Sequence, residues 1–169
     1  MSKREVAEKF FTSLEGVLYG KSKFSSVVND DRCIIFVFQF PSQPGDEPGQ
    51  ERSLRYLLTY REQSDNWIIA LSQPLGYGIR QRREVAAALA KAKSRNDFQE
   101  HVSDDESVDG VVLNLHGDLS EKPFDVEELG RDAALAILVS RVVSLAQEFF
   151  KAQELIYKEI GPPADTRRH

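Results

Sequence analysis

The sequence predicts an α+β fold, an antiparallel sheet meander covered by an N-terminal helix, a middle alanine-rich helix and a long C-terminal helix. Three observations support this fold class. Residues 32–71 contain runs in which apolar and polar side chains alternate, as in sheet strands. Residues 82–96 are rich in alanine, which has the highest helix propensity. Residues 125–160 place apolar side chains over about half of the helical circumference, more than the ~100° stripe of an ordinary surface helix.

The remaining elements follow from apolar spacing and from turn residues. The first helix is expected over 3–19, since its apolar side chains recur with helical spacing and Gly20 is suited to end it. The predicted strands span 23–28, 32–40, 52–61, 67–71, 98–102 and 111–116. The prolines and glycines of 41–50 predict an exposed loop. One domain over 1–160 and a disordered tail over 161–169 are expected.

The last helix predicts a partner. Unbroken, 125–160 would be ~54 Å long, whereas a compact chain of this length is about 40 Å across. The side chains expected to cover the sheet are Leu138, Val142, Leu145, Phe149 and Ile156. The side chains expected to form a second, partner-binding surface are Ile137, Leu155 and Tyr157. A protein partner, a second copy of the chain, or both would cover that surface.

Composition narrows the class of protein. The net charge of −5 argues against nucleic-acid binding, because the average field repels phosphate. Cys33 is the single cysteine, so no intrachain disulfide can form and a reducing compartment is indicated. The apolar run 133–139 is interrupted by Ser140 and Arg141, which predicts no membrane span. A cytoplasmic, acidic protein is expected.

One cluster of basic residues suggests a possible anion site. Arg80, Arg82 and Arg83 follow the flexible segment 76–78 and lie near a helix start, where guanidinium groups and the helix dipole favour phosphate or a carboxylate. The alternative is a solvated turn with local ion pairs. The segment lacks the complete glycine pattern of a nucleotide-binding loop.

Metal and catalytic chemistry receive less support. His101, His116 and Asp118 could converge on zinc or iron, but their spacing is equally that of surface histidines. The acidic residues around Asp104 and Asp109 lack the ligand order of a calcium loop and suit a solvated turn. No nucleophile motif is present, so we assign no catalytic residue, no metal and no cofactor, and expect no enzymatic activity.

The aromatic side chains of the meander leave an alternative open. The residues concerned are Phe36, Phe38, Phe40, Tyr56, Tyr60 and Trp67. They could line a ligand cavity beneath the long helix. Packing in a covered sheet is the other interpretation.

The order of elements resembles a known fold. The segments 6–18, 32–71, 84–96, 111–119 and 126–160 are similar in order and pattern to the type III secretion chaperone-like fold, including the bacterial YbjN-type domain. The resemblance implies a small cytoplasmic, usually dimeric, non-enzymatic protein that binds another polypeptide along its sheet or helix surface. The proline-rich loop and the longer last helix depart from that pattern.

The prediction is therefore a non-enzymatic, chaperone- or adaptor-like protein-binding module that uses its long C-terminal helix and sheet. One alternative is a small-molecule-binding protein or enzyme with an aromatic-lined cavity. Another is an immunity or inhibitor protein, since an acidic chain suits a basic target.

Overall fold

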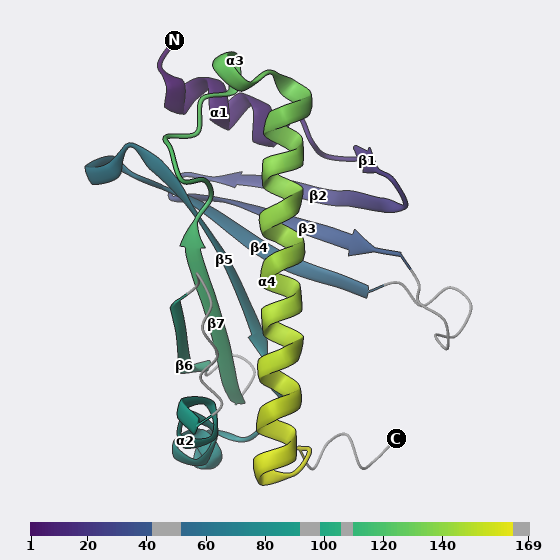
Figure 1. Ribbon diagram of the computed structural model, residues 1–169, viewed down its shortest axis with the longest axis vertical. Helices are drawn as coiled ribbons and strands as arrows, with labels where there is room; N and C mark the ends of the chain where they lie inside the picture. Colours follow the sequence, from purple (N-terminus) through teal and green to yellow (C-terminus); the bar gives the residue numbers. More distant parts are fainter. Residues whose placement is uncertain (42–51, 92–98, 106–109, 164–169) are drawn as a thin grey trace. The chain divides into compact units, whose positions relative to one another are not determined.

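The computed structural model describes residues 1–41, 52–91, 99–105 and 110–163; within 99–105 it describes only the side chains of Val102 and Ser103. The described residues form a seven-stranded antiparallel sheet and four α-helices (Figure 1), which confirms the predicted α+β class. The strand order is β1-β2-β3-β4-β5-β7-β6. The chain divides into two compact units, Met1–Ala70 with Asp118–Val142 and Leu71–Gly117 with Val143–His169.

The first unit contains the predicted meander. Its strands are β1 (Leu18–Tyr19), β2 (Ser22–Asp30), β3 (Cys33–Phe40), β4 (Arg52–Arg61) and the beginning of β5 (Asn66–Pro74). Consecutive strands pair antiparallel, so that Phe36 of β3 lies between Val27 of β2 and Tyr56 of β4. The short 3-10 helix η1 (Glu62–Ser64) joins β4 to β5.

The aromatic side chains of this meander pack on one another. Phe36 and Tyr56 stack with ring centroids 5.2 Å apart, and Phe24 meets Phe38 edge to face at 5.1 Å. All four are buried. The hydroxyl of Tyr56 donates to the backbone oxygen of Val142 at 2.9 Å, which ties the sheet to the last helix. These four rings therefore belong to the core of the first unit.

The first helix is shorter than predicted. Helix α1 spans Lys3–Thr12, so the expected boundary of 3–19 was wrong. Its C-cap residue Ser13 donates its hydroxyl to the backbone oxygen of Phe10 at 2.6 Å. Leu14 remains buried although it follows the helix. The prediction extended the helix too far because Leu14, which is buried by tertiary packing, continues the helical spacing of apolar residues beyond the end of α1.

The long C-terminal segment is broken once. The predicted helix 125–160 is two helices, α3 (Val126–Leu129) and α4 (Arg131–Ile160), separated by Gly130. Gly130 has φ +83°, a conformation that glycine adopts without a Cβ penalty. The predicted long C-terminal helix is therefore confirmed as α4, but it begins at Arg131 and not at 125. The residues expected to cover the sheet are all buried: Leu138, Val142, Leu145, Phe149 and Ile156.

The second unit contains the rest of β5 and α4 with four further elements. These are the 3-10 helix η2 (Ile79–Gln81), helix α2 (Arg82–Lys91) and strands β6 (Gln99–Asp105) and β7 (Gly110–Asp118). Both predicted strands exist and are longer than expected, and they pair antiparallel. The predicted alanine-rich helix begins at Arg82 as expected, and its last residues, 92–96, lie outside the described part of the chain.

The end of α4 is fastened within the second unit. Tyr77, which follows β5, donates its hydroxyl to the backbone oxygen of Gly161 at 2.5 Å. Pro163 is buried and lies where a side chain on Gly76 would have to go, 2.9 Å from an ideal Cβ. Residues 164–169, most of the tail predicted to be disordered, lie outside the described residues.

Candidate functional site

An open groove lies in the first unit between the segment 119–125, helix α3 and the first turns of α4. Its cavity volume is about 590 Å³. Its apolar lining residues are Leu119, Pro123, Leu129, Ala136 and Ile137. Its polar lining residues are Ser120, Glu121, Lys122, Asp125, Glu128, Ser140 and Arg141. We call it the Ile137 groove.

The wall formed by 119–125 is held in place by contacts from distant elements. The amide nitrogen Nδ2 of Asn66 donates to the backbone oxygen of Ser120 at 3.0 Å. From α4, Nε of Arg141 donates to the backbone oxygen of Leu119 at 3.1 Å. Both bonds are part-buried and hold this wall to β5 and α4 through contacts within the protein itself.

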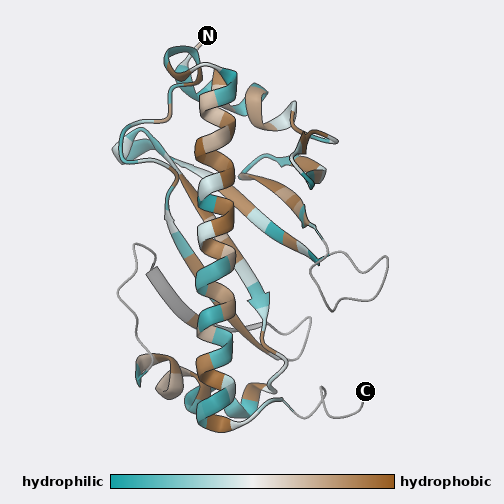
Figure 2. Cartoon of the chain, turned by 45° about the vertical axis from the view of Figure 1, so that its right-hand side comes forward, coloured by the Kyte–Doolittle hydropathy of each residue, from teal (hydrophilic) through white to brown (hydrophobic). Residues whose placement is uncertain are grey.

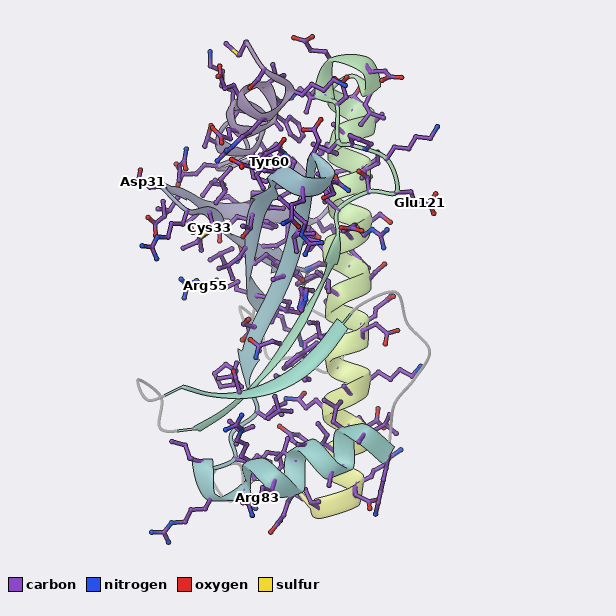
Figure 3. The ribbon with its side chains drawn as sticks, turned by 90° about the vertical axis from the view of Figure 1, so that its left-hand side faces the viewer. Asp31, Cys33, Arg55, Tyr60, Arg83 and Glu121 are labelled. Atoms are coloured by element: carbon purple, nitrogen blue, oxygen red, sulfur yellow. The ribbon has the colours of Figure 1, made fainter. Side chains whose placement is uncertain are left out.

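The rim of the groove carries charges of both signs. Asp125 caps α3 by accepting from the backbone N–H of Glu128 at 3.3 Å, and its other carboxylate oxygen lies 3.6 Å from the ammonium of Lys3. Glu121 and Lys122 are exposed, and Glu121 extends outward beside α4 (Figure 3). These exposed charges can pair with a ligand at little desolvation cost.

The floor of the groove is apolar and partly open to solvent. Leu119 is buried, Ile137 is half-buried and Leu129 remains 37% exposed. Figure 2 shows apolar and polar positions alternating along α4, and the apolar Ala136 and Ile137 of this helix line the groove. An apolar floor with a charged rim is the general composition of protein–protein interface cores and their margins.

The structure separates the three predicted partner-binding residues. Ile137 lines the groove, whereas Leu155 and Tyr157 belong to the second unit. Leu155 is half-buried. Tyr157 donates its hydroxyl to the backbone oxygen of Leu75 at 3.2 Å and packs edge to face on Tyr77. Burial raises the pKa of the Tyr157 phenol. Tyr157 therefore serves the internal packing of its unit.

Sequence reasoning missed most of the groove. Leu119, Pro123 and Leu129 line the groove but were not among the residues predicted to bind a partner. One signal was available: Phe124 precedes the N-cap Asp125, as in a hydrophobic staple, and such a residue directs the entering chain against the protein.

The predicted anion site has no buried component. Arg80 in η2 and Arg82 and Arg83 at the start of α2 are all exposed; Figure 3 labels Arg83 on the helix. Arg82 already has an interaction within the protein. An anion site at these residues stays a prediction.

The candidate metal-binding residues and the single cysteine were also located in the structure. Among the described residues, no three His, Cys, Asp or Glu side chains gather where they could hold a metal ion. The side chain of His101 lies outside those residues, so its pairing with His116 and Asp118 is untested. The acidic side chains around Asp104 lie outside them too. Cys33 is a half-buried free thiol on β3.

Helix α4 is also long and apolar enough to cross a membrane by length and composition alone. The core helices of soluble proteins pass the same test, so this is weak support for a span.

Comparisons with protein-family models, with curated proteins and with solved structures found no match to this chain. The resemblance to the type III secretion chaperone-like fold therefore stays a prediction.

Proposed function

We propose that the chain is a non-enzymatic, adaptor- or chaperone-like module that holds a segment of another polypeptide in the Ile137 groove. The groove itself is the observation that carries the proposal: a preformed apolar floor, a charged rim and an open mouth on one side of α4. Ile137 and Leu129 would supply the apolar contact. Full burial of one such side chain contributes about 1.5–3 kcal/mol.

The rim favours a polypeptide as the occupant. The lining includes the acidic Glu121, Asp125 and Glu128 and the basic Lys122 and Arg141. Charges of both signs around an apolar centre can fix the register of a peptide that carries charges of its own.

The test is affinity capture from the native host with the wild-type chain and two variants. Ile137→Asp places a carboxylate on the groove floor. Ala133→Asp makes the same addition one turn earlier on α4, at an exposed position outside the groove lining. We expect the Ile137→Asp variant to lose the captured protein and Ala133→Asp to retain it. With the purified partner, calorimetry should show weakening of about tenfold to a hundredfold for Ile137→Asp alone.

Capture that is equal for both variants would show that the partner binds elsewhere. Light scattering of the same proteins tests a second copy as the occupant, since Ile137→Asp would then convert a dimer to a monomer. Far-UV circular dichroism confirms that each variant is folded before either measurement is read.

One observation favours a second candidate function. A cavity of about 590 Å³ falls within the roughly 300–1,000 Å³ of small-molecule sites. Native mass spectrometry of freshly purified protein distinguishes the two, because a co-purified small molecule would add a discrete mass that Ile137→Asp removes. The lining contains no aromatic side chain, unlike the aromatic cavity that the sequence suggested.

A further inference from the structure

The meander of the first unit has a second face, which carries apolar side chains in register. The face that holds Phe36 and Tyr56 is covered by buried side chains of the helices. Phe11 of α1, for example, packs edge to face on Trp67, with ring centroids 5.0 Å apart. Along β3 and β4, the residues that alternate with Phe36 and Tyr56 point to the opposite face of the sheet. In Figure 3, Cys33 and Arg55 project from the side of the sheet opposite α4. We call this side the open face.

The centre of the open face is a row of three apolar residues. Val28 of β2 pairs with Ile35 of β3, and Ile35 pairs with Leu57 of β4. Residues directly opposite in an antiparallel pair share a face, with Cβ atoms about 5 Å apart. Val37 extends the row along β3. Val28 is 55% exposed, and the other three are half-buried.

A further apolar residue, Leu18, marks the outer end of the face. Leu18 of β1 pairs with Lys23 of β2, which in turn pairs with Gln39 of β3, so all three lie on the open face. Leu18 is 67% exposed. Leu18 and Val28, two of the most exposed large apolar side chains of the described chain, thus lie on the same side of the sheet, at opposite ends of β2.

The charge of the open face is opposite to that of the chain. Lys23 and Arg55 lie on it by register, and Arg61 does so by alternation along β4 from Leu57. Asp30, paired with Cys33, is acidic, and the exposed Asp31 of the following turn extends to the same side of the sheet in Figure 3. None of the three basic residues forms an ion pair with another described residue. A basic, apolar surface on a chain of net charge −5 therefore has unmatched positive charge.

We propose that the open face binds an acidic amphipathic helix of another protein. The backbone groups of β3 pair with β2 on one side and β4 on the other, so a ligand on this face must be recognised by side chains. A helix with an apolar stripe between rows of carboxylates offers the complementary surface. A second copy would oppose two basic faces, and like charges across an interface are unfavourable.

Nucleic acid is a poor fit to the same charges. Single-stranded nucleic acid is bound on sheet faces through aromatic stacking platforms. The open-face positions of β2, β3 and β4 that are set by the register carry no aromatic side chain. The aromatic residues Phe24, Phe36 and Tyr56 lie on the opposite, buried face.

The test uses two synthetic helical peptides of about five turns, identical in their leucine stripe, with glutamates flanking it in one and lysines in the other. Fluorescence anisotropy should show binding of the glutamate peptide at least about tenfold tighter than the lysine peptide. Val28→Asp should weaken the glutamate peptide about tenfold or more, and the side chain is exposed enough for the variant to fold. Arg55→Glu should shift the preference toward the lysine peptide, a change that loss of structure would not produce. The rate at which Cys33 is alkylated, measured by mass spectrometry, should fall when the glutamate peptide binds.

Ile137→Asp should leave the affinities for both peptides unchanged. A failure of the open-face proposal can therefore be distinguished from a failure of the function proposed for the Ile137 groove. Equal binding of both peptides, or an unchanged preference in Arg55→Glu, would overturn the proposal. A dimer in light scattering that Val28→Asp converts to a monomer would overturn it too, because the occupant would then be a second copy.

Discussion

Replacing Gly76 with alanine should destabilise the protein more than the same change at Gly16, Gly20, Gly78 or Gly130, where an added Cβ would meet no atom within 4 Å. Gly76 has φ +90°, and a Cβ there would lie 2.9 Å from Cγ and 3.2 Å from Cβ of Pro163. Real Cβ atoms essentially never approach another heavy atom within 3.0 Å, so the alanine must displace the chain that follows α4. Tyr77, the next residue, holds Gly161 by a hydrogen bond, which limits how far that chain can move.

Two terms add in this substitution. A positive φ costs a side-chain-bearing residue about 1–2 kcal/mol, and forcing extra atoms into a packed site costs about 1–3 kcal/mol. The expected loss in free energy of unfolding is therefore about 2–5 kcal/mol. Gly16→Ala isolates the first term, because Gly16 has φ +82° and a Cβ there would meet nothing within 4 Å. That control should cost about 1–2 kcal/mol.

The assay is urea denaturation followed by far-UV circular dichroism, with the wild type, both alanine variants, Pro163→Gly and the double variant Gly76→Ala with Pro163→Gly. A double-mutant cycle should give a coupling of about 1–3 kcal/mol between positions 76 and 163. Equal losses for Gly76→Ala and Gly16→Ala, together with zero coupling, would refute the inferred packing of Pro163.

Three further predictions concern buried polar groups. Tyr56→Phe removes the bond to the Val142 carbonyl and should lower the free energy of unfolding in urea by about 1 kcal/mol; no change would mean that the bond is absent in solution. Asn66→Ala leaves the backbone oxygen of Ser120 without its donor and should cost about 1–3 kcal/mol, measured in the same way, whereas a neutral result would show that 119–125 needs no such anchor. Burial, with a smaller contribution from a neighbouring tyrosine, raises the pKa of Tyr77 to about 12; its neutral form is thus favoured in the folded state, and the resulting stability is complete below pH 10 and lost between about pH 10 and 12. Between about pH 10 and 12, the melting temperature of Tyr77→Phe should fall less steeply with rising pH than that of the wild type. An identical dependence of melting temperature on pH in the two proteins would contradict the assignment.

The sequence predicted best the elements in which apolar side chains keep the same strand or helix spacing without interruption. Strand β4 has the predicted bounds, Arg52–Arg61, because its apolar side chains alternate over the whole length. The buried side of α4 was likewise predicted correctly at Leu138 and Ile156. Both results depend on local periodicity, which is readable without knowledge of the rest of the chain.

Where the prediction failed, a single residue changed the backbone or a distant residue changed the packing. Gly130 lies inside an otherwise helical pattern, and an isolated glycine there is compatible with either continuation or a break. Its positive φ, visible only in the structure, decides for a break. The groove depends on Asn66 and Arg141, which bind 119–125 from far along the chain, and no local pattern encodes such contacts.

Burial along α4 alters the physical basis for expecting a partner. The apolar residues of the wide arc all lie in α4, which is continuous from Arg131 to Ile160, and α4 buries many of them while Tyr157 bonds internally. Large apolar side chains that stay exposed include Leu129 in the groove, Leu18 and Val28 on the open face, and Phe150 on α4 itself. These two surfaces differ in charge, since the groove has an acid-rich rim and the open face is basic. If both proposed surfaces bind their ligands, increasing ionic strength should weaken both interactions, because both depend on exposed charges.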